Sequence, residues 1–356
     1  MAQVCLVLVL VGITAYAVLG GADFGGGFWD LTAGGAERGG RIRGMVQRSM
    51  SPVWEANHVW LIFVLVMVWT AFPVAFGSMF STLAVPLFLA AVGIIFRGTA
   101  FALRGHAATV REARVIGATF ALSSVLVPFF LGAAIGGIAS GRVPVGNVAG
   151  DAVSSWLNPT GVLIGVLAVL TGAYLAAVFL AGDSVDATQP DLARAFRARA
   201  LGAGVVTGVV AIGGLFVLRS DARPLFDGLT SGGGLVAVLV SALAGAATLA
   251  LVASERYALA RWSSAVAVTA ITAGWALAQS PYVLPPHLTL DQAAASDTTL
   301  VTLVIGMGIG AVVLVPSLAF LYRLVLQGRL QHEFEPLDQR FRPVAPPGRA
   351  EGEGSP

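Results

Sequence analysis

The feature that most constrains the fold is a series of long apolar runs separated by short polar segments. A bilayer core about 30 Å thick needs roughly 20 apolar residues for each helical crossing. Nine runs approach or exceed that length, at about 3–31, 54–76, 80–103, 115–139, 160–181, 199–218, 234–253, 261–279 and 299–325. The sequence therefore predicts an all-α polytopic membrane protein with nine transmembrane helices, the first of which should tilt or bend near its glycines.

The composition excludes the common soluble classes. Of the 356 residues, 56% are hydrophobic and only 11% are charged, whereas soluble domains carry about 25% charged residues. All 21 basic residues are arginines, and they are spread over short loops rather than gathered in a patch, so we expect no nucleic acid partner. The single cysteine, Cys5, excludes an internal disulfide.

The arginines predict how the chain crosses the membrane, because cytoplasmic loops carry an excess of positive charge. Seventeen arginines fall on one side, in the segments 32–53, 104–114, 182–199, 254–261 and 323–349. Three fall on the other side, namely Arg142, Arg219 and Arg223. We therefore expect the N-terminus outside and the C-terminus in the cytoplasm.

The chain divides into one membrane domain and a tail. No interval between the runs can hold a second folded domain, so we expect an integral membrane domain over 1–330. The segment 331–356 contains PVAPPGRAEGEGSP, whose proline, glycine and charge predict a disordered cytoplasmic tail. The first run lacks a basic segment before it, so we expect a retained helix rather than a cleaved signal.

Two ionisable residues stand at the mouth of the second run, in SPVWEANHVWL at 51–61. Glu55 lies about one turn into the expected helix, and His58 follows three residues later on the same face. Trp54 and Trp60 suit the membrane interface, where an amphipathic ring is favoured. One interpretation is that Glu55 and His58 only sit at headgroup level and touch water.

The first run carries two acids in GGADFGGGFWD at 20–30. Asp23 falls in the half of the span that faces the cytoplasm, and Asp30 lies seven residues later on roughly the same face. An ionisable side chain within a span is costly and suggests an ion path or a buried pair. The surrounding glycines either allow another helix to approach closely or bend the helix.

A third charged residue at similar depth is Arg97, in GIIFRGTAF on the third run. In one interpretation, Arg97 and an acid form a purely structural ion pair. In the other, Asp23, Glu55 and His58 line a hydrophilic path from the cytoplasm, and Arg97 keeps an acid ionised nearby. The residues alone leave both interpretations open.

These elements together resemble subunit II of the cytochrome bd-type quinol oxidases. The likeness rests on GADFGGG, SPVWEANHVWL and FRGTAF, and continues more weakly in DLARAFRARAL at 191–201 and SPYVLPPHLTL at 280–290. It spans about 1–330. The residues that carry the first two motifs are Gly21, Gly25, Gly27, Trp54, Asn57 and Trp60.

The resemblance implies two four-helix bundles plus one peripheral helix, in the cytoplasmic membrane of a bacterium. It also implies a complex that oxidises quinol and reduces dioxygen to water. Haem b, haem d and the quinol site would lie on subunit I, in a heterodimer with this chain among membrane lipid and quinone, and a small accessory subunit can be present. This chain would ligate no haem, would support subunit I and would contribute to proton uptake.

The family's path acid falls on Glu55, and the aspartate of its glycine-rich element falls on Asp23. The sequence departs from the family at Ala56 and His58, where glycine and then Glu or Gln are frequent, and at Gly20, where another aspartate is frequent. The departures imply a path with fewer or different groups, in which His58 can take part.

The residues themselves also argue against haem ligation. Haem iron needs axial ligands such as histidine, methionine or cysteine. Of His58, His106, His287 and His332, only His58 lies near a span, and it has no histidine at matching depth. Met67, Met79 and Met307 are better explained as packing residues.

Two alternatives stay open from the sequence. A proton-coupled secondary transporter fits the many spans, although the two halves lack matched broken helices. A purely structural membrane partner of a haem subunit, with Asp23 and Arg97 as an internal pair, fits the same residues.

Overall fold

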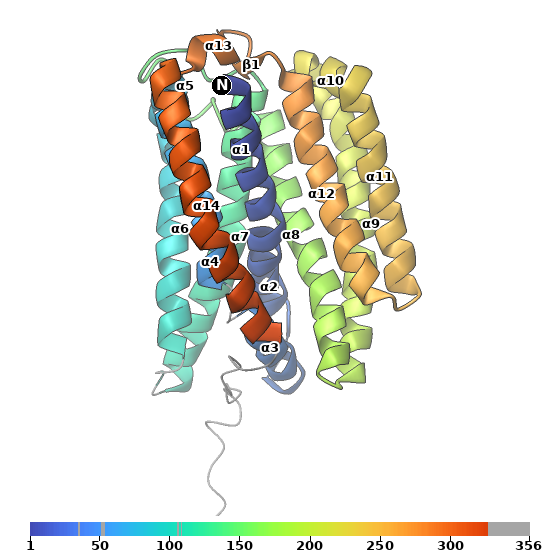
Figure 1. Cartoon of the computed structure of the whole chain (residues 1–356). Coiled ribbons are helices and arrows are strands. Elements are labelled where there is room, and N and C mark those ends of the chain that lie inside the picture. Colours follow the sequence, from blue (N-terminus) through green and yellow to red (C-terminus); the bar gives the residue numbers. More distant parts are fainter. Residues whose placement is uncertain (35, 51–53, 105–106, 108, 327–356) are drawn as a thin grey trace, which may run out of the picture.

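The computed structural model describes residues 1–34, 36–50, 54–104, 107 and 109–326, and these are helical almost throughout (Figure 1). The predicted tail at 331–356 lies outside the described residues. The elements in chain order are α1 Ala2–Ala15, the π-helical turn η1 Tyr16–Gly20, α2 Gly21–Leu31, α3 Ala36–Met50, α4 Trp54–Ala71, α5 Pro73–Thr82, α6 Ala84–Leu103, α7 Val110–Ala139, α8 Pro159–Asp186, α9 Pro190–Asp221, α10 Arg223–Leu229, α11 Gly232–Ala253, α12 Tyr257–Gln279, β1 Tyr282–Leu284, β2 Leu288–Thr289, α13 Leu290–Ala293 and α14 Asp297–Leu326.

Within the described residues, seven helices are long and apolar enough to cross a membrane. They are Ala2–Leu31, Ala84–Leu103, Val110–Ala139, Pro159–Asp186, Pro190–Asp221, Gly232–Ala253 and Asp297–Leu321. The predicted runs 54–76 and 261–279 fall on α4 and α12, which are outside these seven. The fold is thus all-helical and polytopic, as predicted.

One predicted boundary is wrong. The second run was expected to continue to about 76, but α4 ends at Ala71 because Phe72 leaves the helical region, with φ −134° and ψ 60°. A residue before proline is pushed out of the α region, and Pro73 then starts the short helix α5 as its first residue. The following span begins at Ala84 rather than near 80.

The helix α3 was not predicted. It occupies most of the segment 32–53, which the sequence suggested as a polar connection. Its apolar residues recur at helical spacing, and Ile42, Met45, Val46 and Met50 are buried in a cluster with α8. A 15-residue amphipathic helix escapes a search for runs of about 20 apolar residues.

The two ends of the helical array differ in charge. In Figure 1 the N-terminus lies at the same end as α5, α10, β1 and α13, and α3 lies at the opposite end. We call these the N-terminal end and the α3 end. The arginines of α3, of the first turns of α9 and of the α11–α12 turn lie toward the α3 end, whereas Arg142, Arg219 and Arg223 lie at the N-terminal end.

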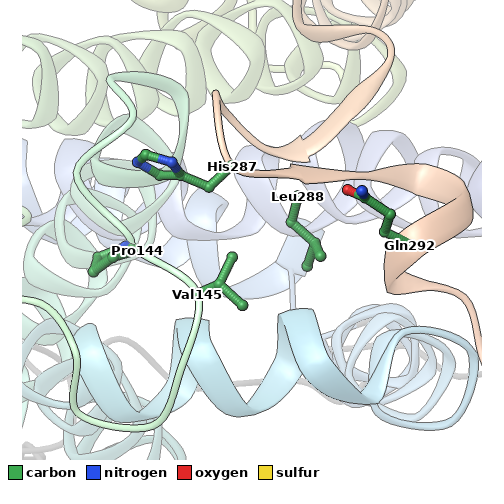
Figure 2. Close-up of a pocket in the computed structure, with 5 residues that line it drawn as sticks. All are labelled: Pro144, Val145, His287, Leu288 and Gln292. Atoms are coloured by element: carbon green, nitrogen blue, oxygen red, sulfur yellow. The ribbon is translucent and has the colours of Figure 1, made fainter.

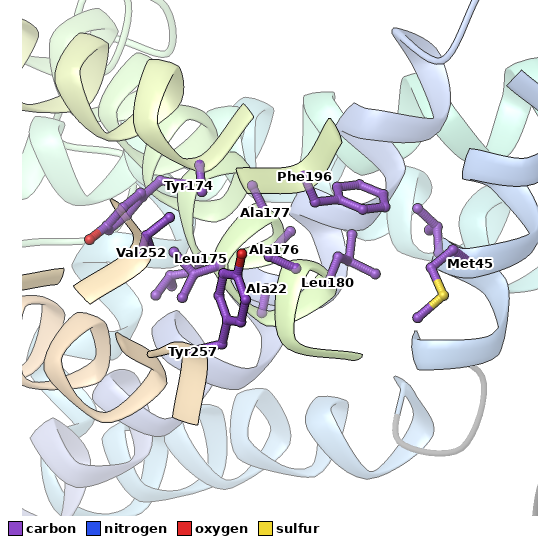
Figure 3. Close-up of a cluster of buried hydrophobic side chains, with 14 of the residues drawn as sticks. Ala22, Met45, Tyr174, Leu175, Ala176, Ala177, Leu180, Phe196, Val252 and Tyr257 are labelled. Atoms are coloured by element: carbon purple, nitrogen blue, oxygen red, sulfur yellow. The ribbon is translucent and has the colours of Figure 1, made fainter. Parts of the chain in front are cut away.

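The long helix α8 is the centre of packing, because it contacts α2, α7, α9 and α12. Figure 3 shows part of the cluster on it, where Leu175 and Leu180 of α8 meet Phe196 of α9 and Tyr257 of α12. A second buried cluster joins α1, α4 and α7 to the β1–β2 hairpin. The candidate site lies between these clusters, on the faces that α2 turns to α4, α6 and α7.

Candidate functional site

Two buried ion pairs join the first helix to α6. Asp23 Oδ1 accepts from Arg97 Nη2 at 2.8 Å, and both side chains are at most 2% exposed. Asp30 Oδ2 accepts from Arg104 Nη2 at 2.5 Å, and both side chains are 4% exposed. The spacing is seven residues on each helix, so the pairs stack about 10 Å apart along the bundle. The two pairs therefore form two successive levels of opposite charge along the bundle, which we call the ion-pair ladder.

Arg97 is held on every side. Its Nε donates to Ser124 Oγ at 2.9 Å, and Nη2 also donates to the backbone carbonyl of Asp23 at 3.3 Å. The guanidinium lies over the rings of Phe24 and Phe120, 4.7 and 5.0 Å from their centroids. A planar, stacked arginine with these partners is a fixed positive charge inside the protein.

The glycines of α2 make the ladder possible. A Cβ on Gly25 would lie 1.9 Å from the carbonyl oxygen of Gly172 on α8, and one on Gly27 would lie 2.2 Å from Ser124 Cβ on α7. At Gly21 the nearest atom is an ordinary 3.7 Å away, on Leu175. Close approach of α8 and α7 is therefore the reason that positions 25 and 27 require glycine.

The first helix also departs from regular geometry just before its glycine-rich element. Residues Tyr16–Gly20 form a π-helical turn, which interrupts the regular backbone ladder. The carbonyl of Leu19 accepts a hydrogen bond from Asn57 Nδ2 at 3.3 Å. Asn57 is 2% exposed, so the motif asparagine of α4 ties that helix to the irregular turn.

His58 lies against the same turn. Its ring stacks on Phe24, with centroids 6.0 Å apart and planes 27° apart, and lies 6.2 Å from the ring of Tyr16. The same Phe24 ring lies beneath the guanidinium of Arg97, 4.7 Å from its centroid, and Arg97 pairs with Asp23. The structure thus brings His58, Asp23 and Arg97 into one neighbourhood.

The structure describes the remaining residues of SPVWEANHVWL only in part. Glu55 and Trp54 belong to α4, one turn closer to the α3 end than His58, but their side chains lie outside the described part of the structure. Trp60 is partly exposed and packs edge to face on Phe63, with centroids 6.2 Å apart.

Sequence reasoning missed Arg104, Ser124 and Tyr16. Arg104 was assigned to a loop, although its spacing from Arg97 repeats the spacing from Asp23 to Asp30, and that signal pointed to a second pair. No sequence motif or spacing pointed to Ser124. Tyr16 lies in the middle of the first run and belonged to none of the motifs that the sequence singled out.

The other candidate ligands lie apart. Figure 2 shows His287 of the β1–β2 connection beside Pro144, Val145, Leu288 and Gln292, around an open hollow of about 460 Å³. His106 and His332 are not among the described residues. Met67 is fully buried in the cluster of α1, α4 and α7. The described ranges contain no group of three His, Cys, Asp or Glu side chains that could hold a metal ion.

Comparison with known proteins decides the family. A family model described as cytochrome bd terminal oxidase subunit II matches residues 1–325. The chain belongs to this family. The resemblance carried by GADFGGG, SPVWEANHVWL and FRGTAF is confirmed, and the chain is a subunit of a bd-type terminal oxidase, in the bacterial membrane.

The relatives of this subunit II chain are distant, and the share of the chain that they match differs. The putative cytochrome bd menaquinol oxidase subunit II of Bacillus subtilis is 22% identical over 329 residues, which span 88% of this chain and 92% of the relative. The cytochrome bd-I ubiquinol oxidase subunit 2 of Escherichia coli K12 is 28% identical over 173 residues, 46% of this chain and 43% of its own length.

The fold agrees with that of a chain in a solved bd oxidase. A chain in the structure of bd oxidase from Geobacillus thermodenitrificans superposes with a TM-score of 0.73 at 24% sequence identity. The match covers 91% of this chain and 98% of that chain. The helical arrangement of Figure 1 is therefore shared over nearly the whole length.

Proposed function

We propose that this subunit of a quinol:oxygen oxidoreductase delivers protons from the cytoplasm and supports a haem-bearing subunit I, on which haem b, haem d and the quinol site lie. The observation that carries the proposal is the buried charged site between α2, α4 and α6. Its core, the Asp23–Arg97 pair, is almost fully buried inside the bundle. Charges at that depth are expensive and are usually retained for function or for pairing.

Helices α2, α4 and α6 carry the charged residues of the proposed path at successive levels along the bundle. Asp30 and Arg104 lie two turns closer to the α3 end than Asp23 and Arg97. Glu55 lies one turn closer to that end than His58, which stacks beside Phe24. An acid at position 55 is thus one turn from the level of the buried pair, on the cytoplasmic side of it.

The roles follow from the charges. Arg97 neutralises Asp23 and holds it, so Asp23 lines the path as a fixed anion rather than as a carrier. Glu55 then accepts and releases the proton, and His58, between the rings of Tyr16 and Phe24, is the next titratable group.

The described residues do not fit an axial haem site. His58 and His287 are the described histidines, and they lie on α4 and on the hairpin at the N-terminal end. The ring of His58 is occupied by aromatic neighbours, and Met67 is packed in the core. These positions support haem ligation by the partner, where the haems supply oxygen reduction.

The proposed architecture has two bundles. In the first, α1–α2 packs with α4 and α7, and α7 packs with α6; in the second, α8 packs with α9 and α12, and α11 packs with α9 and α12 (Figure 1). Helix α14 crosses outside them, against α4 and α1. With these as nine crossings, the arginine-rich α3 end faces the cytoplasm and the N-terminus lies outside.

Substitution of the proposed carrier tests the function. In the complex purified through a tag on this chain, we expect Glu55→Gln to slow proton uptake and oxygen consumption roughly ten- to a hundredfold, because Gln cannot carry a proton. The haem spectrum should be unchanged. Glu255→Gln, which alters an exposed acid in the α11–α12 turn, is the matched control.

The same experiment separates the structural alternative. Normal turnover and proton uptake in an intact Glu55→Gln complex would leave this chain as a purely structural partner. Membership of the oxidase family disfavours the secondary transporter. A chain that moved a solute alone in liposomes would be needed to restore that alternative.

A further inference from the structure

Three buried polar atoms around the π-helical turn have no hydrogen-bond partner among the residues that the structure describes. They are the hydroxyl oxygen of Tyr16 on η1, Oδ2 of Asp23 on α2 and Oδ1 of Asn57 on α4. Buried polar atoms in native proteins are almost always paired, with protein or with ordered water. Three such atoms on adjoining elements therefore indicate a bound polar species rather than three separate defects.

Tyr16 and Asp23 lie along one stripe of the first helix. The ring of Tyr16 rests on Gly20, where an added Cβ would be 2.9 Å from the ring. Residues three and four apart are neighbours on a helix, so Gly20 in turn adjoins Asp23 and Phe24. Because Gly20 has no side chain, the ring of Tyr16 can lie directly over position 20, on the side of the helix that leads to Asp23.

Helix α4, which carries Asn57 and His58, supplies the other residues beside the π-helical turn. The rings of Tyr16, Phe24 and His58 lie within 6.0–6.3 Å of one another, measured between centroids. Asn57 precedes His58, and its amide nitrogen is fixed on the carbonyl of Leu19. Its Oδ1 is thereby left as an acceptor at the same turn.

The donors and acceptors match one kind of ligand. Asp23 Oδ2 and Asn57 Oδ1 can only accept, whereas the Tyr16 hydroxyl can donate. A water molecule donates two hydrogen bonds and accepts others, so one water can satisfy all three atoms. A metal cation bound by the three oxygens would leave the phenol proton without an acceptor, and an anion would be repelled by the carboxylate.

We propose that the Tyr16 hydroxyl, Asp23 Oδ2 and Asn57 Oδ1 bind buried water at the π-helical turn, and that Tyr16 positions this water as the next proton station beyond Glu55 and His58. The inference deepens the proposed function and rests on it. The water receives a proton as a hydronium-like species beside the Asp23 carboxylate and releases one onward, so no atom is gained or lost. Tyr16 orients the water and does not itself change charge.

The first test is direct. In a high-resolution density map of the purified complex, we expect a water within hydrogen-bond distance of the Tyr16 hydroxyl and Asp23 Oδ2. A dry space, or a lipid or quinone group filling it, overturns the proposal whatever the variants do.

The second test removes only the hydroxyl. We expect Tyr16→Phe to slow proton uptake severalfold and to change the solvent deuterium isotope effect, with haem content unaltered. Tyr174→Phe is the matched control, because Tyr174 is a buried tyrosine of α8 that packs in the other bundle beside Thr248 of α11. Loss of proton uptake in both variants would contradict a specific role for Tyr16.

The outcomes distinguish this inference from the proposed function. If Glu55→Gln slows proton uptake and Tyr16→Phe does not, the path stands and the role of Tyr16 fails. If neither variant slows uptake, both proposals fail. A Tyr16→Phe complex that lost its haems would also overturn the positioning role, since it would show that the hydroxyl is needed for assembly.

Discussion

At the scale of single residues, the ion pair of Asp23 and Arg97 carries the largest energetic consequence. Both side chains are at most 2% exposed, and each charge is compensated mainly by the other. Removing one partner of such a pair leaves an uncompensated charge in a low-dielectric interior, which costs far more than loss of an exposed pair. The pair therefore constrains how α2 and α6 can pack.

A double-mutant cycle tests this interdependence. We expect Asp23→Asn and Arg97→Met each to destabilise the complex by about 3–5 kcal/mol, and the double variant to recover part of that loss. Thermal unfolding of the purified complex measures it. Asp227→Asn, in an exposed pair with Arg223, should cost at most about 1 kcal/mol. Strictly additive losses at 23 and 97 would show that the two charges do not depend on each other.

Much of this site could be predicted from spacing and depth. The seven-residue spacing from Asp23 to Asp30 placed both acids on one face, and Arg97 was expected at the depth of Asp23. One interpretation of the sequence named the pair of Asp23 and Arg97, but the sequence alone could not exclude Glu55 or Asp30 as the partner of Arg97. Only the parallel course of α2 and α6 puts residue 97 beside 23 and residue 104 beside 30.

At the scale of elements, α2 is shaped by its glycines and by the turn before it. Gly25 and Gly27 bring α8 and α7 to backbone contact, and η1 leaves the Leu19 carbonyl to Asn57. Close approach, one of the two uses of glycine that the sequence suggested, thus occurs at Gly25 and Gly27, and the irregular turn lies just before them.

Gly25 and Gly21 should differ in how well they tolerate substitution by alanine. We expect Gly25→Ala to destabilise the complex by about 3 kcal/mol or more, because the new methyl meets the backbone of Gly172 and neither helix can yield locally. Gly21→Ala has ordinary contact distances and should be tolerated. The yield and melting temperature of the tagged complex report both. Equal tolerance at 21 and 25 would mean that α2 and α8 are less tightly packed than described.

Element boundaries were less predictable than element existence. The apolar runs located the long helices, but the end of α4 depends on the Phe72–Pro73 geometry, and α3 on a narrow apolar stripe in a charged segment. Mean hydropathy over about 20 residues is insensitive to both. Periodicity at 42, 45, 46 and 50 was the signal that would have found α3.

At the scale of the whole molecule, polar networks at both ends hold α8 among its neighbours. At the N-terminal end, Asp221 of α9 accepts from both Arg142 and the Thr160 hydroxyl, the latter at 2.6 Å. Toward the α3 end, Arg261 of α12 pairs with Asp183 of α8. The apolar middle between them has the length of a membrane crossing.

The proposed orientation makes a labelling prediction. Cys5 is fully buried, so the unmodified chain should not react with a membrane-impermeant maleimide. We expect Val148→Cys, on an exposed connection at the N-terminal end, to react in intact cells. Arg48→Cys on α3 should react only after the membrane is opened. The reverse pattern would place α3 outside and remove the cytoplasmic path.

The account as a whole depends most on the complex in which this chain works. The direct measurement is a reduced-minus-oxidised absorption spectrum of the material purified through a tag on this chain. We predict a d-type haem band in the red together with b-type bands and a co-purifying larger subunit. A haem-free chain without a partner would contradict the proposal that this subunit delivers protons to a bd-type oxidase.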